Sequence, residues 1–99
     1  IIFDPVNLLC VDNIDKQDEI IEKAFELLGD DIAVVHCKDY VVEGNELKSI
    51  AAGTGSLNYP LLLKKIKEYK PYVHCTLENT VPENAVATRE FMERTYAEV

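Results

Sequence analysis

The clearest pattern of hydrophobic and polar positions runs from residue 16 to residue 28, where apolar residues recur at helical spacing. This pattern predicts an amphipathic helix over Lys16–Leu28. Asp15 is the expected N-cap, and Gly29 is the expected residue after the helix end. The expected buried stripe consists of Ile20, Ile21, Ala24, Phe25, Leu27 and Leu28.

Two further stretches predict helices. One follows Asn58, a suitable N-cap, has Pro60 in its first turn and ends at Pro71. The other begins at Pro82 or Glu83 and extends to Glu98. The expected apolar residues of the earlier helix are Leu61, Leu62, Leu63 and Ile66, and its expected solvent-facing residues are Lys64, Lys65 and Lys67. The expected packing residues of the later helix are Ala85, Val86, Phe91, Met92, Tyr96 and Val99.

Three short apolar runs predict β-strands. The first, Ile1–Phe3, stops at Asp4 because the proline that follows cannot donate to a sheet ladder. The second is Ile32–Lys38, and the third is Tyr72–Leu77, which closes at Glu78. β-branched residues such as valine suit strands of this kind.

A small hairpin is predicted between the second strand and the helix that follows Asn58. Two β-type runs flank Glu43, Gly44 and Asn45, which suit a tight turn. The stretch after the hairpin, 51–58, contains Gly53 and Gly55 and is expected to be a loop.

The order of these elements is β-α-β-hairpin-α-β-α, which predicts an α/β fold with a parallel sheet and right-handed crossovers. With three main strands and all helices on one side, one sheet face would stay open, carrying Ile2, Val34 and Thr76. Parallel sheets are normally covered on both faces. The chain, 1–99, is therefore expected to be a single partial domain of a larger structure, or one that is completed by oligomerisation.

Composition and charge narrow the function classes. The net charge of −8 disfavours binding to the phosphate backbone of nucleic acids. The sequence has no apolar run of about 18 residues, so no membrane span is expected, and no signal peptide is visible, although the chain opens at Ile1 rather than Met. Three cysteines without a C-x-x-C spacing indicate a reduced, cytoplasmic setting, and Cys37 and Cys75 are expected to be small core residues.

Three polar side chains fall at or near the C-terminal ends of the predicted strands: Asp4, His36 and Glu78. Alternation along a strand places each of them on the face that is expected to stay open. In a barrel this face is the interior, and catalytic groups lie at its C-terminal rim. Oxygen and nitrogen donors that converge in this way suit Mn, Mg, Zn or Co. A lone histidine is more often a core residue; His74, which lies deeper in its strand on the same face, is expected to pack in the core or in the lumen of a barrel.

Four segments resemble a known family. They are Phe3–Asn7, Val35–Asp39 with its His-x-Lys-Asp element, Gly53–Tyr59 and Leu77–Asn79. In this order they resemble the C-terminal part of the xylose-isomerase-like TIM barrels, which include sugar phosphate isomerases and epimerases and the family-2 AP endonucleases. The resemblance covers essentially the whole chain, but it does not select one activity within the superfamily.

The resemblance implies a C-terminal fragment of a (β/α)8 barrel, with three parallel βα units and a hairpin excursion. It implies that Asp4, His36 and Glu78 bind a divalent metal and that Glu78 also serves as acid or base in proton transfer next to a carbonyl. A further glutamate ligand of the sugar-converting relatives would lie upstream of Ile1. The metal site is therefore expected to be incomplete in this chain, which is expected to be inactive alone and to form a homo-oligomer or a swapped dimer.

Three neighbouring residues are assigned to substrate binding. Lys38 could meet a substrate hydroxyl or phosphate, but a solvated lysine at a strand end is an equal alternative. Asp39 could contact substrate or orient His36, and a loop cap is equally plausible. Asn7 is the third residue that is assigned to substrate binding. Gly53 and Gly55 could hold amides for a phosphate, although a plain turn is the simpler interpretation.

Two departures from the motifs of the nucleic-acid-cleaving relatives bear on which activity is expected. Asn7 stands where the nucleic-acid-cleaving relatives carry a second histidine, and Tyr40–Ala52 contains no histidine for their Asp-x-His pair. The favoured function is therefore a metal-dependent sugar or sugar phosphate isomerase or epimerase, with a small-molecule partner rather than nucleic acid. The alternatives are a DNA-repair endonuclease of AP endonuclease family 2 and a non-catalytic binding domain on the same scaffold.

Overall fold

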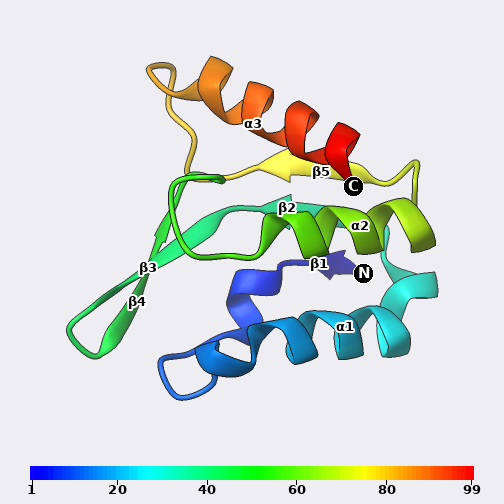
Figure 1. Ribbon diagram of the computed structural model, residues 1–99, viewed down its shortest axis with the longest axis horizontal. Coiled ribbons are helices and arrows are strands. Elements are labelled where there is room, and N and C mark those ends of the chain that lie inside the picture. Colours follow the sequence, from blue (N-terminus) through cyan, green and yellow to red (C-terminus); the bar gives the residue numbers. More distant parts are fainter.

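A three-stranded parallel sheet lies at the centre of the structure, a computed structural model that describes residues 1–99 (Figure 1). Its strands are β1 (Ile2–Phe3), β2 (Val34–Cys37) and β5 (His74–Leu77), in the order β1-β2-β5. In the register of the sheet, Val34 pairs with Ile2 on one side and with His74 on the other. The predicted α/β fold with a parallel sheet is confirmed.

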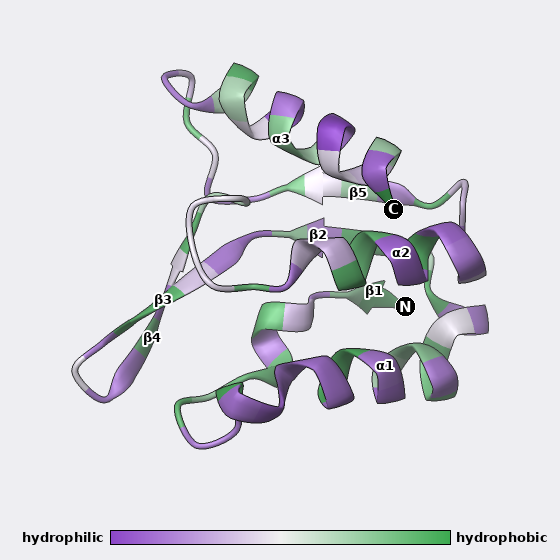
Figure 2. Ribbon diagram, in the orientation of Figure 1, coloured by the Kyte–Doolittle hydropathy of each residue, from purple (hydrophilic) through white to green (hydrophobic).

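Three helices pack on one face of this sheet: α1 (Gln17–Leu28), α2 (Tyr59–Tyr69) and α3 (Ala85–Glu98). The apolar side chains of α1 and α2 form one core with the side chains of Phe3, Val35 and Cys37. Hydrophilic and hydrophobic residues alternate along α1 and α2, as helical amphipathicity requires (Figure 2). None of the helices is long and apolar enough to span a lipid bilayer.

The opposite face of the sheet is open, as predicted. Along β2 the side chains of Val35 and Cys37 are fully buried under the helices, whereas alternate positions are only partly buried. On the open face Ile2 is 64% exposed, and Thr76 is exposed as well. His74 is also exposed there because no second layer covers this face, so it does not pack in a core, and packing in a barrel lumen stays a prediction.

The predicted hairpin is present as β3 (Asp39–Glu43) and β4 (Glu46–Ile50), an antiparallel pair that projects away from the central sheet (Figure 1). Gly44 has a φ of 61°, a conformation that suits glycine at a tight turn. The hairpin starts directly after the C-terminal end of β2, so its base lies beside the edge of the sheet where the predicted site residues gather.

Several helix-end predictions need correction. A 3₁₀ turn, Ile14–Lys16, precedes α1 and contains Asp15, so this residue does not cap the helix. Gly29 has a φ of −50° and continues into another 3₁₀ turn instead of taking a left-handed conformation. Its small size matters for packing, because a Cβ atom there would lie 2.8 Å from the Tyr69 ring. The N-cap prediction for α2 is confirmed, since the side chain of Asn58 accepts a hydrogen bond from the backbone of Leu61.

Some expected packing positions are also wrong. Leu27 of α1 and Val86 of α3 are 65% and 62% exposed, so both lie outside the buried faces of their helices. Cys37 is in the core, but Cys75 is exposed because β5 is an edge strand that α3 covers only in part. Lys67 is not solvated: its ammonium donates hydrogen bonds to backbone carbonyls at the end of α3.

Candidate metal centre

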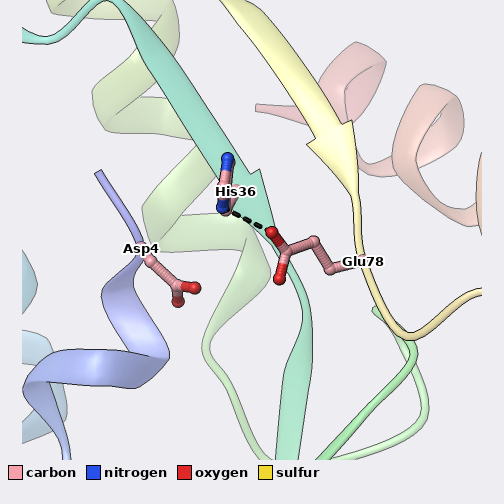
Figure 3. Close-up of side chains that lie close together, drawn as sticks. All are labelled: Asp4, His36 and Glu78. Atoms are coloured by element: carbon pink, nitrogen blue, oxygen red, sulfur yellow. Dashed lines mark ion pairs between the residues drawn. The ribbon is translucent and has the colours of Figure 1, made fainter. Parts of the chain in front are cut away.

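Three parallel strands carry Asp4, His36 and Glu78 to one edge of the sheet. Asp4 directly follows β1, His36 lies in the central strand β2, and Glu78 directly follows β5. One nitrogen or oxygen atom from each residue forms a group whose members all lie within 4.8 Å of one another (Figure 3). The sheet topology thus brings together the three residues that the sequence singles out as metal ligands.

His36 and Glu78 are in direct contact. The Nδ1 atom of His36 lies 2.5 Å from the Oε1 atom of Glu78, and the two side chains are 28% and 32% exposed. The backbone of Glu78 donates a hydrogen bond to the carbonyl of Cys37, so the pairing of β2 with β5 extends one residue beyond the strand. This extension fixes the glutamate beside the histidine on the open face of the sheet.

Asp4 is held in place by contacts with Asn7 and Lys38 rather than with His36 or Glu78. It caps the 3₁₀ turn Pro5–Leu8, and its Oδ1 atom accepts a hydrogen bond of 3.4 Å from the backbone of Asn7. Its Oδ2 atom lies 3.2 Å from the Nζ atom of Lys38, which also donates to the Asn7 side chain at 3.1 Å. The structure therefore places Lys38 and Asn7 next to the predicted ligands, and Asn7 is exposed.

Lys38 is not the solvated lysine that the sequence left as an alternative. Its side chain is 12% exposed, and the side chain of Asp4 is 8% exposed. Partly desolvated ion pairs are screened less than surface pairs, so the attraction between these two charges is weakened less by salt than that of an exposed pair. The ammonium of Lys38 is committed to Asp4 and Asn7 and does not point freely into solvent.

Of the roles that the sequence left open for Asp39, the structure supports the loop cap rather than a substrate contact. Its side chain is buried, and its two oxygens accept four backbone hydrogen bonds, from Tyr40, Gly53, Gly55 and Leu57. The carboxylate therefore organises the loop 51–58 at the base of the hairpin and neither orients His36 nor faces a substrate. The same contacts occupy the amides of both glycines, so these amides are not available to a phosphate.

Sequence reasoning missed two residues that secure this region. Gln17 donates to the carbonyl of Ser56 and accepts from the backbone of Asn58, which ties α1 to the loop. Tyr59 donates its hydroxyl proton to the carbonyl of Lys38 over 2.6 Å. Burial raises the pKa of Tyr59 far above its ordinary value, with smaller contributions from nearby charges, so the hydroxyl remains a donor. An isolated glutamine or tyrosine gives no sequence signal for such contacts.

The donor set fits a divalent cation of intermediate hardness. Two carboxylates and one imidazole suit manganese, zinc or cobalt, and the carboxylates also suit magnesium. Three protein ligands leave coordination positions for water or a substrate, as catalytic metal sites require. The group also lies toward the open face of the sheet, where an incoming molecule can reach it (Figure 3).

The fold and the site define an α/β domain with a candidate metal centre at the C-terminal edge of a parallel sheet. Comparison of the chain with protein-family models, with curated proteins and with solved structures found no match. The superfamily resemblance of its motifs therefore stays a prediction.

Proposed function

We propose that this chain provides the C-terminal three βα units of a (β/α)8 barrel whose activity is metal-dependent isomerisation or epimerisation of a sugar or sugar phosphate. One observation carries the proposal: donor atoms of Asp4, His36 and Glu78 converge within 4.8 Å at the C-terminal edge of the sheet. Catalytic groups of barrel enzymes lie at this edge. The motif resemblance supports the choice of reaction class.

A divalent cation bound by these residues would polarise substrate oxygens and so acidify the neighbouring carbon. Glu78 is positioned to move the proton: its carboxylate is one-third exposed, and His36 holds one of its oxygens in place. Asn7, exposed beside Asp4, can contact a substrate hydroxyl. Lys38 acts on the proposed site through its ion pair with Asp4, and Asp39 acts on it only by organising the loop 51–58.

The open sheet face supports the barrel part of the proposal. Ile2, Val34 and Thr76 line a face of a parallel sheet that lacks a second layer, and such faces are normally covered. In the proposed protein this face lines the barrel interior. We further propose that the isolated chain covers it by forming a homo-oligomer or a swapped dimer through its edge strands, β1 and β5. A strict monomer in light scattering at high concentration would contradict this.

A phosphodiesterase of the endonuclease type is less well supported. Asn7 binds Lys38 where a further histidine ligand would be needed, and the other histidine, His74, is not part of the ligand group. The net charge of −8 also opposes an approach to DNA.

The test compares Glu78→Gln with the wild-type chain. Calorimetric titration with Mn²⁺ should show an affinity loss of about tenfold or more, since the charged ligand is replaced by a neutral amide. Glu22→Gln, on the exposed side of α1, is the matched control and should bind Mn²⁺ normally. In the complete barrel, Glu78→Gln should also abolish deuterium exchange at the carbon next to a ketose carbonyl. Retention of both properties would refute the proposal, and cleavage of abasic-site DNA would favour the endonuclease.

A further inference from the structure

Lys38 reaches from the end of β2 across to the turn that follows β1. Its Nζ atom lies 3.2 Å from Oδ2 of Asp4 and 3.1 Å from Oδ1 of Asn7, so two groups of that turn share one ammonium. Both partners in the ion pair are largely shielded from solvent. The backbone carbonyl of Lys38 is itself held by Tyr59, so both the main chain and the side chain of this residue are fixed.

This contact determines how Asp4 can act as a ligand. A carboxylate has two oxygens, and Lys38 occupies one of them. The Oδ1 atom, which accepts a longer hydrogen bond of 3.4 Å from the backbone of Asn7, is therefore the oxygen that can bind a cation while the ion pair with Lys38 is intact. Calcium is often bound by both oxygens of a carboxylate, whereas smaller cations such as magnesium require shorter and more regular coordination.

The same ammonium also lowers the negative charge of the site. Asp4 and Glu78 contribute two carboxylates, and Lys38 offsets one of them. A less negative site binds every dication less strongly, so the contact is not explained by cation affinity alone. The restriction of Asp4 to its Oδ1 atom as a cation ligand is a geometric effect that discriminates between cations.

We propose that Lys38 is a positioning residue that makes the site selective for small divalent cations over calcium by occupying one oxygen of Asp4. The inference rests on the proposed function only in that the site binds a divalent cation; it does not depend on the identity of the substrate. Without Lys38, Asp4 is free to present both oxygens, a mode of binding that calcium adopts readily and that smaller cations, which need shorter and more regular coordination, adopt less readily.

The experiment measures the affinities of the chain for Mn²⁺ and Ca²⁺ by calorimetry, in wild type, Lys38→Met and Lys38→Arg. In Lys38→Met the preference for Mn²⁺ over Ca²⁺ should fall by about tenfold, the scale on which contacts to ligating carboxylates act. Lys38→Arg, which keeps a cation beside Asp4, should retain most of the preference. Lys48→Met removes an exposed lysine from the hairpin ion pair with Glu43 and should leave the preference unchanged.

The possible outcomes separate the two proposals. A wild-type chain that binds neither cation overturns the metal centre and this inference together. A chain that binds Mn²⁺ and keeps its preference in Lys38→Met overturns the inference alone. An equal loss of both affinities in Lys38→Met shows a merely structural role and also overturns it. If Lys38→Met does not fold, as judged by circular dichroism in EDTA, Lys38→Gln takes its place. The same fall in the preference for Mn²⁺ over Ca²⁺ is then expected of Lys38→Gln.

Discussion

The Nδ1 atom of His36 lies 2.5 Å from Oε1 of Glu78, although the register of the sheet pairs His36 with Thr76. The two side chains therefore meet diagonally, across adjacent parallel strands, on the open face of the sheet. Asp4, which follows the strand on the other side of β2, completes a group in which one donor atom from each residue lies within 4.8 Å of the others (Figure 3).

Replacement of this histidine tests the nitrogen ligand. His36→Ala should lower the affinity for Zn²⁺ by about tenfold or more and the affinity for Mg²⁺ by less, because imidazole suits zinc while magnesium prefers oxygen. His74→Ala is a close control, since His74 lies on the same sheet face but outside the ligand group. Competition against a chromogenic chelator measures the affinities for Zn²⁺ and Mg²⁺ in each variant. Equal effects of the two alanine variants would show that the imidazole of His36 is not a ligand.

Asp39 gives a prediction about stability. Asp39→Asn replaces one acceptor oxygen with an NH₂ group that faces backbone N–H donors, two of which, from Gly53 and Gly55, bind the same oxygen. The unfolding free energy should fall by about 2 to 4 kcal/mol, because buried donors lose a charged acceptor. Urea denaturation measures this loss. Asp12→Asn, at an exposed position, should stay within about 0.5 kcal/mol of wild type; a similar loss in both variants would contradict the role of Asp39.

The convergence of the three candidate ligands could be predicted from the sequence because strand alternation is local. Once Asp4, His36 and Glu78 are placed at strand ends, parallel pairing brings their side chains to one edge and one face. The role of Asp39 could not be predicted in the same way. Its acceptor contacts reach as far as Leu57, and only the folded loop brings that amide to the carboxylate. A charged residue near a site thus predicts substrate contact and loop support equally well.

The helix ends show a second limit. The N-cap of α2 follows from the side chain of Asn58, a local interaction that the sequence contains in full. The role of Gly29 instead depends on the ring of Tyr69, which belongs to another helix. Exposure of Leu27 likewise depends on which side of α1 packs against the rest of the fold, which the apolar pattern of the helix alone does not determine. The cap at Asn58 could therefore be predicted from its own segment, whereas the roles of Gly29 and Leu27 follow from contacts between elements.

Two glycines should respond very differently to alanine. A Cβ atom on Gly55 would lie 2.2 Å from the carbonyl oxygen of Tyr40 and 2.7 Å from the carboxylate of Asp39. Gly55→Ala must therefore move the loop and should cost about 3 kcal/mol or more. Gly44 has a φ of 61° but open space around it, so Gly44→Ala should cost only about 1 kcal/mol of backbone strain. Thermal unfolding of both variants checks the order, and a larger loss for Gly44→Ala would show that the loop does not pack as described.

Tyr59 should make stability fall at alkaline pH. Burial raises the pKa of this hydroxyl in the folded chain, while in the unfolded chain it titrates near its ordinary value of 10.0. Below that pH the tyrosine is protonated in both states and its contribution is fully present. Above that pH the unfolded state releases a proton that the folded state keeps, so stability falls by about 1.4 kcal/mol per pH unit from this group.

Tyr59→Phe isolates this effect. At neutral pH it should cost about 1 kcal/mol, because the carbonyl of Lys38 loses its donor. Above about pH 10 its unfolding free energy should decline less steeply than that of wild type. The difference in slope should be about 1.4 kcal/mol per pH unit, the contribution of one proton. Part of the decline should remain, since burial also raises the pKa of Tyr40. Tyr72→Phe, at a position that is 96% exposed, should keep the wild-type slope. Urea denaturation from about pH 8 to about pH 11 measures these slopes, and parallel curves for wild type and Tyr59→Phe would mean that Tyr59 ionises as readily in the folded chain as in the unfolded one.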